Sequence, residues 1–128
     1  MNKTILATGV LFGFLAVLLG AFGAHGLKEL LPEKELITYE TGVRYQMYHA
    51  LLLLILGSLN AINEKGKKWI YLFLVAGILC FSFSLYFLAT AGLTGLDFKA
   101  LVYMTPVGGL FLLTGWILML YRLFRPIT

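Results

Sequence analysis

Four long apolar runs, joined by short polar segments, dominate this chain. The runs cover approximately residues 4–25, 43–62, 69–90 and 100–123, and each has roughly the 20 residues that a helix needs to cross a bilayer. The composition agrees, because 60% of the residues are hydrophobic and only 12% are charged, whereas soluble domains carry about 25% charged residues. The pattern therefore predicts an all-α fold, a four-helix transmembrane bundle that forms a single membrane domain over residues 1–128.

The longest polar segment, Lys28–Glu40, lies between the first two apolar runs. Pro32 suits the first turn of a helix, where its missing N–H is not needed. Glu33 and Glu35 follow it and would interact favourably with the positive end of the helix dipole. We therefore expect a short amphipathic helix at the membrane interface, which bends near Gly42 and continues into the second span.

The first apolar run has two interpretations. A basic start, an apolar stretch and small residues are also typical of a cleaved signal peptide. Small residues, however, recur at every third or fourth position and so share one helical face: Gly9, Gly13, Ala16, Gly20 and Ala24. Because such a groove lets two helices approach closely in lipid, we expect this run to remain as the first span.

The charges predict the orientation of the bundle. Four spans place both termini on one side, together with most of the basic residues and a single acidic one, which are Lys3, Lys65, Lys67, Lys68, Arg122, Arg125 and Glu64. The other side holds Lys28, Lys34, Arg44, Lys99, Glu29, Glu33, Glu35, Glu40 and Asp97. Basic residues prefer the cytoplasmic side, so we predict a plasma (inner) membrane protein with both termini in the cytoplasm. Their position at helix ends also argues against nucleic-acid binding.

Polar side chains that lie within the membrane are concentrated at the start of the second span. Glu40 and Arg44 are four residues apart and can form a salt bridge on one helical face. Gln46 and His49 share a different face, which we expect to point into the bundle, while Arg44 lies nearer the headgroups. His49 is the most deeply placed ionisable residue, and such residues are functional-site candidates by default. His25, in the last turn of the first run, either caps that helix or belongs to the same site.

The sequence offers little for catalysis. The spans hold no acidic residue and no Gly-x-Ser-x-Gly motif, and Cys80 is the single cysteine, so neither a nucleophile–base pair nor a zinc cluster is indicated. Ser82, Ser84 and Tyr86, in the third span, suit interhelical hydrogen bonds. We predict a protein that is not an enzyme and that binds no cofactor or metal.

Three kinds of membrane function stay open on these residues. The leading hypothesis is a binding or structural protein with an outward-side polar pocket formed by His25, Arg44, Tyr45, Gln46, His49, Ser84 and Tyr86. Membrane lipids are the expected ligands, through an anionic headgroup, and a second copy of the chain or another membrane helix is the alternative partner. A proton-coupled transporter that uses His49 is the second hypothesis. A haem or metal site between His25 and His49 is the third.

Several segments resemble one known family. They are Gly20–Leu27, Tyr39–Leu51, Phe83–Tyr86, and Pro106–Gly109 with Gly115 and Trp116, and together they resemble the bacterial domain-of-unknown-function-423 family. The resemblance implies a multi-pass plasma-membrane protein of four helices, and it brings no established activity. The third span has Phe81-Ser82-Phe83-Ser84 where the family has a glycine between the aromatic residue and the serine, which would alter the packing there.

Overall fold

The computed structural model describes residues 1–96 and 99–126, and these form a bundle of long helices without a strand. Asp97, counted above among the acidic residues, lies outside the described residues. Helix α1 (Lys3–Phe22) continues into a π-helical turn, η1 (Gly23–Leu27), and helix α2 (Glu33–Ser58) returns beside it. The third rod consists of α3 (Glu64–Ile78), the π-helical turn η2 (Leu79–Phe83) and α4 (Ser84–Thr94), and the fourth is α5 (Leu101–Leu123). The predicted four-helix fold is confirmed.

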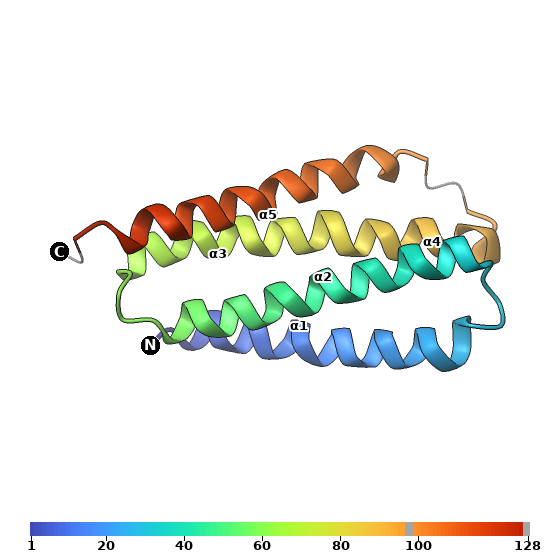
Figure 1. Cartoon of the computed structure of the whole chain (residues 1–128), viewed down its shortest axis with the longest axis horizontal. Coiled ribbons are helices and arrows are strands. Elements are labelled where there is room, and N and C mark those ends of the chain that lie inside the picture. Colours follow the sequence, from blue (N-terminus) through green and yellow to red (C-terminus); the bar gives the residue numbers. More distant parts are fainter. Residues whose placement is uncertain (97–98, 127–128) are drawn as a thin grey trace.

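Figure 1 shows the four rods running back and forth, with α1 beside α2 and α3 beside α5. Both termini lie at the same end of the bundle, called here the termini end, and the opposite end is called the far end. Within the described residues, three stretches are long and apolar enough to cross a membrane, namely Lys3–Leu27, Glu64–Thr94 and Leu101–Leu123. Large apolar side chains cover their outer surfaces, as the exposed Phe14 and Ile117 illustrate. A surface of this kind suits lipid rather than water.

Helix α2 differs from its prediction in two respects. The segment expected to form a separate interfacial helix is the first part of α2, which runs unbroken through Gly42. Gly42 serves packing rather than bending, because a Cβ there would lie 2.7 Å from the Tyr86 ring and 3.1 Å from the Ser82 carbonyl oxygen. The helix also ends at Ser58 and not at residue 62, since the turn that follows it leads into the Asn63 cap of α3.

The small-residue face of α1 packs against α2. Gly9 and Ala16 are buried, and a Cβ at Gly9 would lie 3.0 Å from the carbonyl oxygen of Ala50. On the opposite side of the bundle, Gly108 of α5 lies so close to η2 that a Cβ would overlap the backbone nitrogen of Phe81. Both contacts follow the rule that small residues bring helices together in lipid, where no hydrophobic force does so.

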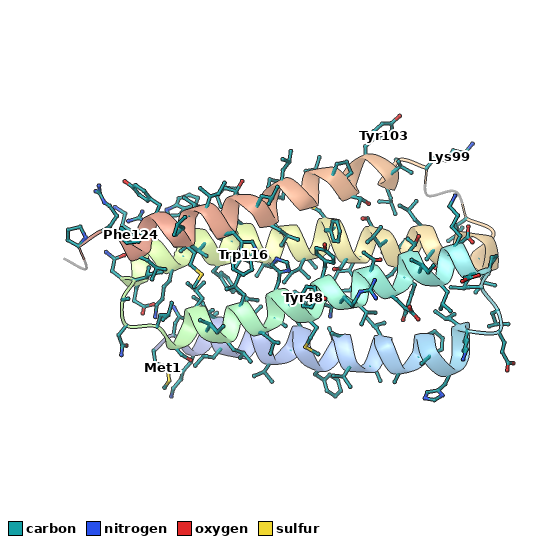
Figure 2. All side chains as sticks on the ribbon, viewed as in Figure 1. Met1, Tyr48, Lys99, Tyr103, Trp116 and Phe124 are labelled. Carbon is teal, nitrogen blue, oxygen red and sulfur yellow. The ribbon has the colours of Figure 1, made fainter. Side chains whose placement is uncertain are left out.

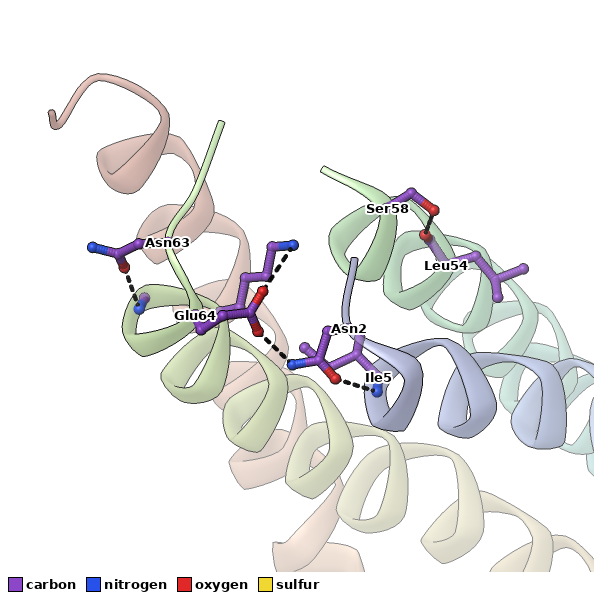
Figure 3. Close-up of polar contacts among 8 residues, drawn as sticks. Asn2, Ile5, Leu54, Ser58, Asn63 and Glu64 are labelled. Atoms are coloured by element: carbon purple, nitrogen blue, oxygen red, sulfur yellow. Dashed lines mark hydrogen bonds and ion pairs between the residues drawn. The ribbon is translucent and has the colours of Figure 1, made fainter. Parts of the chain in front are cut away.

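Polar contacts at the termini end join three helices (Figure 3). The Asn2 side chain caps α1 by accepting from the backbone N–H of Ile5 at 3.0 Å, and it donates to the Glu64 carboxylate at 2.6 Å. The backbone N–H of Asn2 donates to the carbonyl of Gly57 at 2.9 Å. Glu64 also lies 3.6 Å from the ammonium group of Lys67, which is only 1% exposed. This network holds the start of α1, the end of α2 and the start of α3 together.

Candidate functional site

The buried face of α2 carries two polar side chains, Gln46 and His49. They are 0% and 4% exposed, whereas Arg44 is exposed on the outer surface of the same helix. This arrangement is the one that the spacing of the three residues predicts. Since lipid offers no hydrogen-bond partner, each buried polar group must be bonded within the protein, and its partners therefore show its role.

Gln46 connects three helices. Its amide nitrogen donates to the carbonyl of Phe12 in α1 at 2.8 Å, and its amide oxygen accepts from the hydroxyl of Tyr86 in α4 at 2.7 Å. The Tyr86 ring in turn packs against Tyr39, with the ring centroids 5.2 Å apart. Both polar ends of Gln46 are occupied, so Gln46 and Tyr86 hold the bundle together and do not face a ligand.

Hydroxyl groups of the third rod make similar interhelical bonds. Ser84 shares a 2.6 Å hydrogen bond with Thr105 of α5 and also donates to the carbonyl of Phe81 at 2.9 Å. Ser82 donates to the carbonyl of Gly42 in α2 at 2.7 Å. Ser84, which the sequence placed in the binding pocket, is therefore part of the contact between α4 and α5.

His49 bridges α2 and α5. Its Nε2 lies 3.0 Å from the indole nitrogen of Trp116, and its Nδ1 lies 2.7 Å from the carbonyl oxygen of Tyr45. An indole N–H can only donate and a carbonyl can only accept, so Nε2 is the acceptor and Nδ1 carries the proton. The imidazole is neutral in this arrangement, with both nitrogens occupied. A proton could be carried on Nε2 only if Trp116 moved away.

His25 and His49 lie at different depths. A Cβ at Gly13 would meet Ala50, the neighbour of His49, at 3.8 Å, so His49 is level with Gly13 of α1. His25 is twelve positions further along the same rod, which corresponds to about 18 Å, and it is exposed at the far end. Metal–nitrogen bonds are about 2 Å long, so the two histidines do not share a metal or haem. Among the described residues, no group of three or more His, Cys, Asp and Glu side chains could hold a metal ion.

Arg44 does not form the predicted salt bridge with Glu40. An ion pair shorter than 4 Å joins Glu64 and Lys67 instead. The Arg44 guanidinium instead donates to the hydroxyl of Thr41 at 3.4 Å. Arg44 is five residues before His49, or about 7.5 Å nearer the far end. It therefore presents its charge at the outer surface of α2.

A cavity of about 480 Å³ lies between α2, η2 and α5. It is lined almost entirely by apolar and aromatic side chains, which come from Tyr45, His49, Phe81, Pro106, Gly109, Leu110, Leu112, Leu113 and Trp116. We call this space the α2–α5 cavity. Of the residues predicted for the pocket, it includes Tyr45 and His49. Gln46, Ser84 and Tyr86 do not line it, nor do Arg44 and His25.

Trp116 is the site residue that sequence reasoning missed. It projects from α5 toward α2, whereas Tyr103 and Phe124 of the same rod point away from the bundle (Figure 2). A tryptophan in the interior of a span needs an acceptor for its N–H, and His49, at membrane depth, offers one. The need for an acceptor could have indicated that Trp116 belongs to the site. The sequence alone, however, does not show which face of α5 lies opposite α2.

Comparisons with known proteins point to one family. The sequence profile described as "Protein of unknown function (DUF423)" matches residues 19–109. UPF0382 membrane protein SAB0533 of Staphylococcus aureus is 37% identical over 96% of this chain and 97% of its own length. UPF0382 inner membrane protein YgdD of Escherichia coli K12 is 38% identical over 97% of this chain and 92% of its own length. A UPF0382 membrane protein of Haemophilus influenzae is 37% identical, over 98% and 97% respectively. No solved structure matches the chain.

Proposed function

The chain belongs to the DUF423 family of membrane proteins of unknown function, and from that premise we propose that it binds one anionic membrane lipid beside α2. One observation carries this proposal, namely that Tyr45, which lines an apolar cavity, directly follows Arg44, a cation without an acidic partner within 4 Å in the described chain. The lipid chain would occupy the α2–α5 cavity, and the headgroup would lie against Arg44. The proposal includes no catalytic step.

The cavity suits a hydrocarbon chain. Its volume of about 480 Å³ lies within the range of roughly 300–1,000 Å³ that is usual for small-molecule sites. Leu110 and Leu113 line it and are 63% and 59% exposed, so it opens toward the surrounding lipid. An empty apolar cavity forfeits dispersion contacts along its walls, whereas an acyl chain restores them without burying a polar group.

Arg44 suits an anionic headgroup. An arginine within the membrane extends its long side chain toward the nearer interface, and its guanidinium binds phosphate or carboxylate oxygens in pairs. The hydroxyl of Thr41 lies beside it at 3.4 Å, and Tyr48 is exposed one turn further along α2. The charge distribution predicts that this side faces outward, so we infer a lipid of the outer leaflet.

From the same charge distribution we propose that the protein lies in the inner membrane with both termini in the cytoplasm. The Escherichia coli relative is named an inner membrane protein, and the basic residues of the chain gather at the termini end. Reporter fusions at the C-terminus and in the turn before α3 are expected to report the cytoplasm. A periplasmic signal at either position would overturn this orientation.

Native mass spectrometry of the purified protein in mild detergent tests the lipid site. Delipidated protein is offered phosphatidylglycerol, a free fatty acid or zwitterionic phosphatidylcholine. We expect the two anionic lipids to bind in preference to phosphatidylcholine, with one lipid per chain. Arg44→Ala should lower the affinity for them by about tenfold or more, as the loss of a charge-assisted hydrogen bond implies. The phosphatidylglycerol and fatty-acid arms distinguish a phosphate headgroup from a carboxylate.

Arg125→Ala is the matched control. Arg125 lies at the termini end, with its guanidinium 5.3 Å from the centre of the Tyr121 ring, so its removal should leave binding unchanged. Equal lipid retention by the wild type and Arg44→Ala would refute the proposal. So would a dimer that Arg44→Ala dissociates without any change in lipid binding, because the partner of Arg44 would then be a carboxylate such as Glu40 of a second copy.

A further inference from the structure

The lining of the α2–α5 cavity ends, toward the termini end, at a single hydrogen-bonded pair. On α5 its lining extends from Pro106 to Trp116, a length of about 15 Å along the helix. Trp116 is the lining residue of α5 nearest the termini end, and His49 holds the same position on α2. Their rings meet edge to face, with the centroids 5.9 Å apart, and we call this pair the end wall.

This end wall crosses a gap that the backbones do not close. Helix α5 packs closely against α3, η2 and α4, whereas α2 packs against α1 and the third rod. The hydrogen bond of 3.0 Å from Trp116 to His49 therefore reaches across the cavity from one side to the other. Trp116 lies between these helices in Figure 2.

The position of the indole depends on His49. In hydrocarbon no water is present to accept the indole N–H, so losing the His49 acceptor leaves that group unpaired. The imidazole is itself held in place, because its Nδ1 is bonded to the carbonyl of Tyr45 and its ring stacks on the Tyr45 ring at a centroid distance of 6.3 Å. Two contacts thus orient His49, and His49 orients Trp116.

We infer that Trp116 sets the length of lipid chain that the cavity accepts and that His49 is the positioning residue that holds Trp116 in place. This inference rests on the proposed lipid binding. A chain that enters from the Arg44 side and runs toward the termini end meets the indole. A chain that fits the cavity gains contacts along its whole length, whereas a longer chain must bend out into the bilayer. The site therefore discriminates by chain length as well as by headgroup charge.

A competition experiment tests the role of Trp116. Purified full-length protein is offered a mixture of lysophosphatidylglycerols that differ only in chain length, and native mass spectrometry measures the bound fraction of each. The wild type is expected to show a preferred length. Trp116→Ala should raise the ratio of longer to preferred chains by about fivefold or more, equivalent to about 1 kcal/mol. Trp69→Phe, in α3 and outside the lining of the cavity, should keep the wild-type profile.

The role of His49 has its own readouts. His49→Ala should shift the length profile in the same direction as Trp116→Ala, while His49→Gln, which retains an acceptor, should restore the wild-type profile. In the Trp69→Phe background Trp116 is the only tryptophan, so its fluorescence reports the loss of the bond in His49→Ala. Circular dichroism and size-exclusion chromatography show whether each variant is folded. If His49→Ala does not fold, His49→Gln is compared with His49→Leu.

The outcomes separate this inference from the proposed function. Wild-type protein that binds anionic lipid without a length preference would refute the role of Trp116 and leave lipid binding intact. An unchanged profile in folded Trp116→Ala would do the same. A wild type that binds no lysophosphatidylglycerol would refute the proposed function itself.

Discussion

Replacing Gln46 by leucine tests whether interhelical hydrogen bonds hold this bundle together. Leucine has nearly the same volume as glutamine, so the substitution removes polar contacts without creating a large cavity. It eliminates two bonds, one to the Phe12 carbonyl at 2.8 Å and one from the Tyr86 hydroxyl at 2.7 Å. The two consequences differ, because the Phe12 carbonyl retains its place in the α1 ladder whereas the Tyr86 hydroxyl is left without a partner.

The magnitude follows from those two contacts. An interhelical hydrogen bond in a membrane protein contributes about 0.6 kcal/mol on average, which we assign to the bond with Phe12. Leaving the buried Tyr86 hydroxyl unpaired costs about 1–3 kcal/mol. Gln46→Leu should therefore lower the free energy of unfolding by about 2 kcal/mol. Adding Tyr86→Phe removes the orphaned hydroxyl, so the double variant should be more stable than Gln46→Leu alone by about 1 kcal/mol.

Reversible unfolding in mixed detergent and SDS, followed by circular dichroism, measures both values. Thr114→Val is the control, since Thr114 bonds the carbonyl of Leu110 in its own helix at 2.8 Å and its loss should change stability by less than about 0.5 kcal/mol. The reasoning fails if Gln46→Leu is as stable as the control. It fails equally if the double variant loses as much stability as Gln46→Leu and Tyr86→Phe lose in sum, because the two side chains would then not be coupled.

Three further pairs of substitutions test other parts of the bundle in the same unfolding assay. Gly108→Ala should destabilise the protein by about 2 kcal/mol or more, because its Cβ would overlap η2. Gly109→Ala should be neutral, because the nearest contact of its Cβ would be at 3.9 Å. Similar losses of stability in both variants would contradict the packing argument. Asn2→Ala should lower the free energy of unfolding by about 1 kcal/mol through the lost helix cap. Asn2→Asp should keep the cap but repel the Glu64 carboxylate. Equal stability of Asn2→Asp and the wild type would show that the contact with Glu64 does not stabilise the bundle. Lys67→Met should be neutral or stabilising, because an apolar residue replaces a buried charge. Glu64→Ala should destabilise the protein, because it leaves the buried Lys67 unpaired. If Lys67→Met were instead less stable than Glu64→Ala, the role of the ion pair would be refuted.

Much of the fold was predictable from the sequence, and the candidate site was predictable only in part. The lengths of the apolar runs indicated four helical rods, and the spacing of Gln46 and His49 indicated that both face the bundle. The spacing did not show that Gln46 bonds two other helices and so has no free polar group for a ligand. Glu40 and Arg44 were expected to pair because they are four residues apart, yet Arg44 bonds Thr41. Such local pairs are worth only a few tenths of a kcal/mol, too little to determine how a long side chain lies.

The sequence by itself determined that lipid surrounds most of this protein, that its backbone is helical and that it forms four rods. Those properties depend on local composition and length, because a chain in lipid must satisfy its backbone hydrogen bonds within each helix. Only the tertiary structure decided that His49 meets Trp116, that His25 lies about 18 Å from them along the bundle, and that a cavity opens between α2 and α5. These contacts join residues as many as 67 positions apart. They depend on the rotation and neighbours of each helix, which are set by close packing at residues such as Gly9 and Gly108.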